Sequence, residues 1–192
     1  MQQPNDTMAD WYQVENIDGI DSPALLLYKD RIIQNIRQAI GMVPDIAMLR
    51  PHVKTNKIAE VCGMMMDEGI TRFKCATIAE AEMLATINAP DIVLAYQPVG
   101  PKTNRLAHLI KAFPSVQFAC LTDSEEGASH INNTAKANGI KIGVYIDLNT
   151  GMNRTGAAPL KALALAAYVQ SLQNVTLVGL HAYDGHIRDT AI

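Results

Sequence analysis

Residues 140–156 read IKIGVYIDLNTGMNRTG, and this stretch decides the fold. It begins as a nearly continuous apolar run, which is typical of a parallel strand that is covered on both faces. It ends in Asp147 and Asn149 and continues through a glycine-containing loop to Arg154. Apolar residues along a strand and polar residues at its carboxyl end predict an α/β protein whose chemistry lies at the strand ends.

The same alternation of apolar run and helical segment recurs along the chain in units of roughly 25 residues. The helical segments include Asp30 to about Gly41 and Asn56 toward Gly69. Besides a flanking strand at Ala24–Tyr28, we predict six strands, at Ile46–Leu49, Arg72–Cys75, Ile92–Tyr96, Val116–Leu121, Ile140–Leu148 and Val175–His181.

Residues that start and stop helices support these boundaries. Thr77 and Glu80 form a capping box, and Asp123 with Glu126 is a similar start signal. Proline is favoured in the first helical turn and glycine just past the last one. Four residues fill such positions: Pro101, Pro159, Gly69 and Gly139.

Two architectures fit this alternation, an open doubly wound sheet and a (β/α)8 barrel. The sequence holds neither a G-x-G-x-x-G nor a G-x-x-x-x-G-K-[ST] motif, which argues against the nucleotide-binding open sheets. Polar residues instead follow several different strands, as they do in barrels. They are His52, Lys54, Gln97, Asp147, Asn149, Arg154, His181, Tyr183 and Asp184. We therefore predict a TIM-type barrel.

The barrel is incomplete by this count, because six strands are found where eight are needed and a typical barrel has about 250 residues. The chain has 192 residues and ends soon after its last polar strand. We expect an N-terminal segment over residues 1–22 and a partial barrel over residues 23–192.

Composition narrows the class of protein. Sixteen basic and 19 acidic residues give a net charge of −3, which argues against nucleic-acid or anionic-membrane binding. The acidic N-terminus does not resemble a signal peptide, and the longest apolar stretches, such as Leu160–Val169, are too short to span a bilayer. Three cysteines without C-x-x-C spacing favour a reduced cytoplasmic compartment over disulfides or a zinc site.

Three stretches could carry chemistry. In the first, RPHVKTNK at residues 50–57, Lys54 lies just past an apolar run. A lysine in a dry cavity has a lowered pKa and can form a Schiff base, whereas a loop lysine is usually solvated. The second stretch is YIDLNTGMNRTG at residues 145–156. Its Arg154 offers a planar cation for a carboxylate, a phosphate or a heteroaromatic nitrogen, unless it simply pairs with Asp147.

The third stretch, GLHAYDGH at residues 179–186, places two histidines, a tyrosine and an aspartate close together. They could transfer protons or bind a metal, although their spacing matches no familiar zinc site. Alternatively, His181 and Tyr183 pack inward as hydrogen-bonded strand residues.

Five motifs of the chain resemble fold-type III pyridoxal phosphate enzymes. They are DSPAL (21–25), PHVKT (51–55), KCATIAEAE (74–82), IDLNTGMNR (146–154) and GLHAY (179–183). Within that group the chain is most similar to the D-threonine aldolase and D-serine dehydratase branch, relatives of the alanine racemase N-terminal barrel. The resemblance extends from about Trp11 to Arg188.

This resemblance implies roles for five residues. Lys54 would be the catalytic Schiff-base lysine, and Arg154 would be the partner of the pyridine nitrogen. His52 would support the ring of pyridoxal 5'-phosphate, Tyr183 would lie close to it, and His181 is a weaker candidate for a cofactor contact. An arginine at the pyridine nitrogen leaves that nitrogen unprotonated, which makes the ring a weaker electron sink.

The chain departs from the family pattern in two respects. Family members often read Thr-His-Lys after the Schiff-base lysine, whereas this chain has Thr55-Asn56-Lys57. The resemblance also places the phosphate loop, a C-terminal β-domain and a divalent-metal pair beyond Ile192, so no metal ligand is expected in this chain.

The activity implied by the resemblance is that of a pyridoxal phosphate-dependent lyase. It would act on a β-hydroxy D-amino acid, by retro-aldol cleavage or by dehydration, in a homodimer. The alternatives are an amino-acid racemase and a non-catalytic pyridoxal phosphate carrier with the same barrel.

Overall fold

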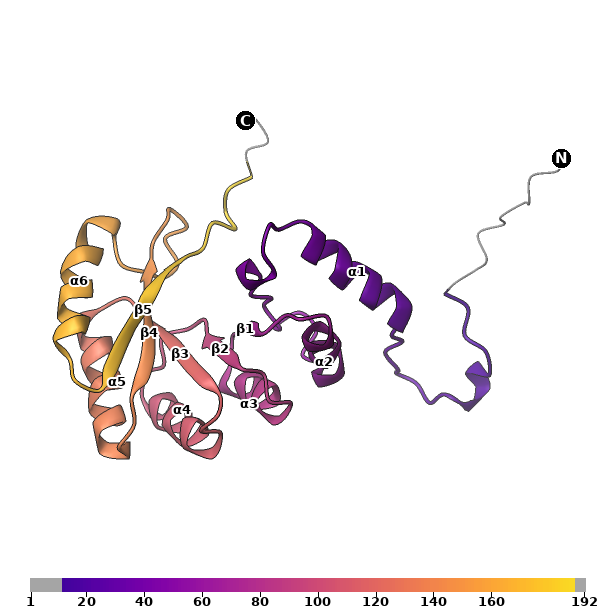
Figure 1. Cartoon of the computed structure of the whole chain (residues 1–192), viewed down its shortest axis with the longest axis horizontal. Coiled ribbons are helices and arrows are strands. Elements are labelled where there is room, and N and C mark those ends of the chain that lie inside the picture. Colours follow the sequence, from indigo (N-terminus) through magenta and orange to yellow (C-terminus); the bar gives the residue numbers. More distant parts are fainter. Residues whose placement is uncertain (1–11, 189–192) are drawn as a thin grey trace.

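The computed structural model describes residues 12–188, in which five parallel strands alternate with helices (Figure 1). The prediction that the acidic N-terminus is not a signal peptide concerns residues that lie outside this range. The predicted N-terminal segment, 1–22, is described only from residue 12, and the predicted partial barrel, 23–192, only up to residue 188. The strands are β1 (Arg72–Cys75), β2 (Asp91–Leu94), β3 (Gln117–Thr122), β4 (Ile142–Leu148) and β5 (Val175–Ala182). The helices are α1 (Lys29–Gly41), α2 (Ala59–Asp67), α3 (Ile78–Thr86), α4 (Pro101–Ala112), α5 (Glu125–Asn138) and α6 (Pro159–Ser171), with short 3-10 helices η1 (Ile17–Gly19) and η2 (Ile46–Met48).

The strands pair in chain order, β1-β2-β3-β4-β5, and every pair is parallel. Each connection between neighbouring strands carries one helix, and Figure 1 shows α3 to α6 around the outside of the strands. The predicted α/β class and the barrel-type order of strands are thereby confirmed. None of the helices in the described residues is long and apolar enough to cross a membrane.

The main core lies between the strands and the surrounding helices. Phe73, Ile92 and Ile146 of the strands pack there with Leu84 and Leu106 of the helices, and all five are fully buried. The continuous apolar runs of the sequence arise because the other strand face is also covered. That inner face carries a smaller cluster formed by Val93, Ala119 and Leu121, with Ala95 and Tyr145 packed against it.

The sheet is strongly curved, as in a barrel wall. In a flat sheet β1 and β5 would lie about 19 Å apart, since neighbouring strands are about 4.8 Å apart. Yet Lys74 Nζ of β1 lies 2.7 Å from His181 Nε2 of β5 across the inner face. This curvature brings the carboxyl ends of all five strands around one space.

The predicted strand Ile46–Leu49 is wrong, because residues Ile46–Met48 form η2. The Asp45 side chain accepts a hydrogen bond from Ala47 N–H, which caps this helical turn and competes with an extended strand. Pro51, which has no N–H to donate, follows it. Only an isolated parallel bridge between His52 and Lys74 remains where the first barrel strand was expected, so the described chain has five strands instead of six.

The predicted flanking strand Ala24–Tyr28 is also wrong. These residues form no strand and pair with no strand of the described chain, and they lead directly into α1. Their leucines are largely exposed, at 76% for Leu25. The apolar run resembled a buried strand, but no sheet edge in residues 12–188 lies beside it.

The predicted helix ends are largely confirmed. Thr77 Oγ1 accepts a hydrogen bond from Glu80 N–H, and Glu80 Oε2 accepts one from Ala76 N–H. At α5 the capping residue is Ser124, which accepts from Gly127 N–H, and not Asp123 as predicted. Four further positions agree with the prediction: Pro101 and Pro159 in first turns, and Gly69 and Gly139 with positive φ past helix ends.

All three cysteines of the chain are free and buried. Burial raises the pKa of the Cys62 thiol to about 11 and that of Cys75 to about 12. A thiol that stays protonated is a poor nucleophile, so these cysteines serve packing and not chemistry.

We expect Thr77→Ala to lower the free energy of unfolding by about 1 kcal/mol, the usual cost of a lost N-cap. The threonine hydroxyl satisfies the otherwise free N–H of Glu80 at the start of α3. Urea denaturation measures the change. Thr86→Ala, at the exposed end of the same helix, is the matched control and should cost less. Equal costs would contradict the role assigned to the cap.

Candidate functional site

A cavity of about 580 Å³ opens at the carboxyl ends of the strands. Its lining includes residues from the segment before α2, from the ends of β1 to β4 and from the loop after β4. They are His52, Lys54, Ala76, Ala95, Tyr96, Gln97, Val99, Leu121, Asp123, Asp147, Arg154 and Thr155. The curvature of the sheet therefore gathers the polar strand ends that the sequence pointed to.

Lys54 lies at the mouth of this cavity, on a segment tied to β1. Val53 N–H donates to Lys74 O, and Lys74 N–H donates to Pro51 O, so the backbone before Lys54 is held like a strand. Val53 is buried, whereas the side chain of Lys54 is exposed. Of the two environments considered for Lys54, the structure therefore shows the solvated one, with the amine facing the cavity.

His52 is held neutral next to Lys54. Its Nδ1 accepts a hydrogen bond of 3.3 Å from Lys54 N–H. Burial, followed by the positive charges of Lys54 and Lys74, lowers the pKa of His52 from 6.5 to about 4. A neutral imidazole can lie against an aromatic ring without adding to the positive charge of the site.

We expect His52→Gln to flatten the acid limb of the stability curve. Between about pH 6.5 and pH 4 the unfolded chain binds a proton at this residue and the folded chain does not, so stability falls as the pH falls through this window. Without His52 the variant gains stability relative to the wild type as the pH decreases. Urea denaturation at several pH values measures this difference. His108→Gln, at an exposed position of α4, should leave the shape of the curve unchanged.

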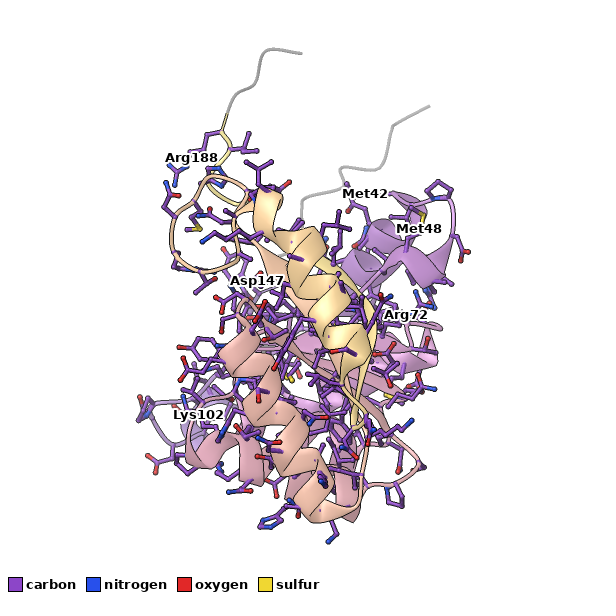
Figure 2. All side chains as sticks on the ribbon, turned by 90° about the vertical axis from the view of Figure 1, so that its left-hand side faces the viewer. Met42, Met48, Arg72, Lys102, Asp147 and Arg188 are labelled. Carbon is purple, nitrogen blue, oxygen red and sulfur yellow. The ribbon has the colours of Figure 1, made fainter. Side chains whose placement is uncertain are left out.

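Asp147, at the end of β4, is buried and organises the centre of the site (Figure 2). Figure 2 places it in the middle of the molecule, whereas Met42 and Lys102 lie at the rim. Asp147 Oδ1 is 2.6 Å from His181 Nδ1, and Oδ2 accepts a hydrogen bond of 2.9 Å from Thr155 Oγ1. Both carboxylate oxygens are therefore engaged.

Arg154 does not pair with Asp147, so this alternative for Arg154 is wrong. Its exposed guanidinium carbon lies 5.2 Å from the ring centroid of Tyr183, within the range of a cation–π contact. Within residues 12–188 no ion pair joins Arg154 to a carboxylate. Its planar donor group is thus free to bind a ligand.

The loop after β4 is built to present Arg154. Asn149 Oδ1 accepts hydrogen bonds from the N–H groups of Gly151 and Asn153, and Gly156 N–H donates to Asp123 Oδ2. Gly156 has φ +99°, and a Cβ there would lie 2.5 Å from Asn149 N. Glycine is therefore required where the loop folds back on its own start.

A match to a family model decides the identity of this fold. The model describes the N-terminal domain of alanine racemase, and it matches residues 27–191, which is most of the chain. The chain belongs to this family. The resemblance to fold-type III pyridoxal phosphate enzymes of the D-threonine aldolase branch is confirmed by the relatives of the chain.

Two curated relatives of this alanine racemase N-terminal family are aldolases. The D-threonine aldolase of an Arthrobacter species is 28% identical over 172 residues, covering 88% of this chain and 45% of that protein. The 3-hydroxy-D-aspartate aldolase of Paracoccus denitrificans is 27% identical over 189 residues, covering 94% of this chain and 48% of that protein. The chain thus spans about half the length of these relatives.

A solved structure agrees with the family assignment. The crystal structure of D-threonine aldolase from Filomicrobium marinum superposes with a TM-score of 0.80 at 26% identity. The match covers 87% of this chain and 45% of that one. The fold described above is therefore that of the N-terminal barrel of such proteins.

In this family member the predicted site residues fall into two groups. His52, Lys54 and Arg154 line the large cavity. Tyr183 and His181 line a smaller adjoining cavity, which shares Asp147 and Arg154 with the large one. Gln97 has a structural role, because its Oε1 accepts hydrogen bonds from Thr122 and Asp123.

The metal ligands considered at the end of β5 are not brought together. Asp184 is exposed, and His186 Nδ1 is buried without a partner. No group of three or more histidine, cysteine, aspartate or glutamate side chains in the described residues could hold a metal ion.

Sequence reasoning missed Lys74 as a site residue. It belongs to the KCATIAEAE motif and is a charged residue inside a strand, between the buried Phe73 and Cys75. Its Nζ lies on the inner face of the sheet, against His181. The signal that could have found it is the alternation of β1, which places Lys74 on the face opposite to Phe73.

Proposed function

We propose that this chain forms the cofactor-holding part of a pyridoxal phosphate-dependent lyase that acts on β-hydroxy D-amino acids. The observation that carries the proposal is the gathering of Lys54, His52 and Arg154 around one cavity at the strand ends. The aldolase relatives support this substrate class. The activity of the whole protein remains a proposal, because the chain spans about half the length of those relatives.

The residues of the cavity fit the functional groups of pyridoxal phosphate. Lys54 offers an exposed amine for its aldehyde, and His52 offers a neutral imidazole for its ring. Arg154 offers an unpaired guanidinium for its pyridine nitrogen. Asp147, the buried carboxylate of the site, is already engaged by His181 and Thr155, so it is not free to protonate that nitrogen.

When bound, the cofactor supplies an electron sink for the bond broken in the substrate. The exposed Lys54 amine would hold the cofactor through its aldehyde group. Arg154 would orient the ring and, as a cation that does not give up its proton, would offer the pyridine nitrogen a hydrogen-bond donor without protonating it. Because the sink is then weaker, the site needs a base close to the substrate hydroxyl or α-carbon.

The same barrel residues also suit three related activities. Loss of the β-hydroxyl would give a dehydratase, inversion at the α-carbon would give a racemase, and binding without chemistry would give a pyridoxal phosphate carrier. We retain the aldolase because both curated relatives described above are aldolases. We further propose that the whole protein is a cytoplasmic homodimer. In this proposal a divalent metal is held by residues beyond Ile192.

Product analysis tests the proposal. The intact protein is incubated with pyridoxal phosphate and D-threonine, and we expect glycine and acetaldehyde in equal amounts. A 2-oxo acid with ammonia would instead indicate the dehydratase, and an epimerised amino acid would indicate the racemase. A bound cofactor with no turnover of any β-hydroxy D-amino acid would indicate the carrier and would contradict the proposed lyase.

A further inference from the structure

Lys74 is a second lysine of the site, and the proposed function gives it no task. It extends from β1 across the inner face of the sheet and is half-buried, in contrast to the exposed Lys54. Its Nζ lies 2.7 Å from His181 Nε2, although the two residues are 107 positions apart in the chain. A half-buried amine held by a defined contact with a residue that lines the smaller cavity is a candidate for acid–base chemistry.

His181 holds this amine in a defined way. Its Nδ1 lies 2.6 Å from Asp147 Oδ1, and a carboxylate can only accept a hydrogen bond, so the Nδ1 proton points to Asp147. In the neutral ring Nε2 then carries a lone pair, which points to Lys74 Nζ. Asp147 is itself fixed by Thr155. The three residues form one chain of hydrogen bonds, Lys74–His181–Asp147. In this chain the ammonium form of Lys74 can donate a hydrogen bond to His181 Nε2.

The charges around Lys74 favour its neutral form. Burial is the largest cause of its lowered pKa, followed by Lys54; Arg154 and Arg50 lower it further, and Asp147 opposes them. Arg50, the smallest of these causes, is itself paired with Asp91, at 2.6 Å and 2.8 Å. The ionisable groups that face Lys74 from the surrounding elements are Arg50, His52, Lys54, Asp147, Arg154, His181 and Tyr183.

The Lys74 amine also lies near Tyr183, which lines the smaller cavity of the site. Its Nζ is 6.0 Å from the ring centroid of Tyr183, and the Arg154 guanidinium is 5.2 Å from the same centroid. Tyr183, His181 and Arg154 all line the smaller cavity, which adjoins the large one at Asp147. The smaller cavity holds only about 30 Å³, so one group of the bound molecule, and not the whole molecule, would reach Tyr183 and come near the Lys74 amine.

We propose that Lys74 is a general base of this site, and that His181 and Asp147 are positioning residues that hold its ammonium form. Neutral Lys74 takes the proton of a hydroxyl group on the bound molecule. The O–H bond breaks, its electron pair stays on oxygen, and an N–H bond forms at Nζ. The new ammonium donates to His181 Nε2 and returns its proton to solvent or product afterwards. The identity of the hydroxyl, that of a β-hydroxy amino acid, rests on the proposed function.

The first test is independent of any activity. The ionisation of Lys74 is followed by NMR of the intact, cofactor-free protein with labelled lysine side chains, and the Lys74 signal is assigned by its absence in Lys74→Met. We expect a midpoint below the ordinary value for lysine of about 10.4. Asp147→Asn should lower it further, and Lys54→Met should raise it, because these changes remove a negative and a positive charge. An ordinary midpoint that responds to neither change would overturn the proposal.

The second test separates a base from a merely structural cation. Lys74→Arg keeps a positive charge and a donor for His181, but a guanidinium does not give up its proton at working pH and cannot act as a base. We expect kcat for D-threonine cleavage to fall by about 100-fold or more, the usual contribution of general base catalysis. Covalent attachment of pyridoxal phosphate at Lys54 should persist, as shown by borohydride reduction and peptide mapping. Lys102→Arg, at the rim of the molecule, is the matched control (Figure 2).

The outcomes distinguish a failure of the proposed base from a failure of the proposed lyase. Near-normal kcat of Lys74→Arg would show that Lys74 is structural and would overturn its role as a base. If Lys74→Arg does not fold, Lys74→Ala with added ethylamine replaces it, and restored turnover supports the base whereas no restoration contradicts it. If the wild type cleaves no β-hydroxy amino acid, the proposed lyase fails, and this general base fails with it even where the titration confirms the hydrogen-bonded chain.

Discussion

Lys54→Met is expected to abolish covalent attachment of pyridoxal phosphate and, with it, every activity that depends on the cofactor. Lys54 is the lysine that lines the large cavity, and its amine is exposed there. Methionine keeps much of the length and apolar character of the side chain but has no nucleophilic nitrogen. Borohydride reduction of the loaded protein followed by peptide mapping measures the effect, with a labelled Lys54 peptide in the wild type and none in the variant.

Two other lysines serve as controls for this assignment. Lys57 lies three positions further along the same segment, but its Nζ is 3.7 Å from Glu80 Oε1, so it is directed to a carboxylate and not to the cavity. Lys74 is nearer to the cavity but is held by His181. Both Lys57→Met and Lys74→Met should retain the label on Lys54. A label on either of these lysines in the wild type, with Lys54 unmodified, would refute the assignment.

The fold could be predicted where local sequence and tertiary surroundings favour the same structure. The continuous apolar runs of β2 and β3 are buried on both faces, as their composition indicated, and Arg72–Cys75 was predicted with its observed bounds. The run Ile46–Leu49 looked similar, but the Asp45 cap and Pro51 favour a helical turn over a strand. Four apolar residues are too few to outweigh such local interactions, which is why this prediction was wrong.

The candidate site was predictable only in part, for a different physical reason. Parallel strands end at one edge, so polar residues after strands, such as Lys54 and Arg154, could be expected around one cavity. The contact of Lys74 with His181 depends on the curvature of the whole sheet, which no local pattern encodes. The alternative in which Arg154 pairs with Asp147 rested on their nearness in sequence, whereas the partner in the structure is His181, which is adjacent across the β4–β5 register.

The open side of the sheet leads to the last prediction. In the described residues β5 pairs only with β4, so its other edge has free backbone groups. Leu180 pairs in register with Ile146, yet Leu180 is 60% exposed whereas Ile146 is fully buried. The helix-covered face of the sheet thus continues onto β5, but it loses its cover at Leu180, near the carboxyl end of the strand. An uncovered apolar edge strand is a template for association with another chain.

A polypeptide of residues 1–192 made on its own is therefore expected to self-associate through β5. Leu180→Lys should shift it toward smaller species in sedimentation velocity, because a charged side chain on an edge strand opposes pairing with a second edge. Val99→Lys, which alters a similarly exposed residue away from that strand, is the control and should leave the distribution unchanged. A monodisperse 20.9 kDa species in the wild type would contradict the prediction, since it would mean that the open edge of β5 is protected within the chain itself.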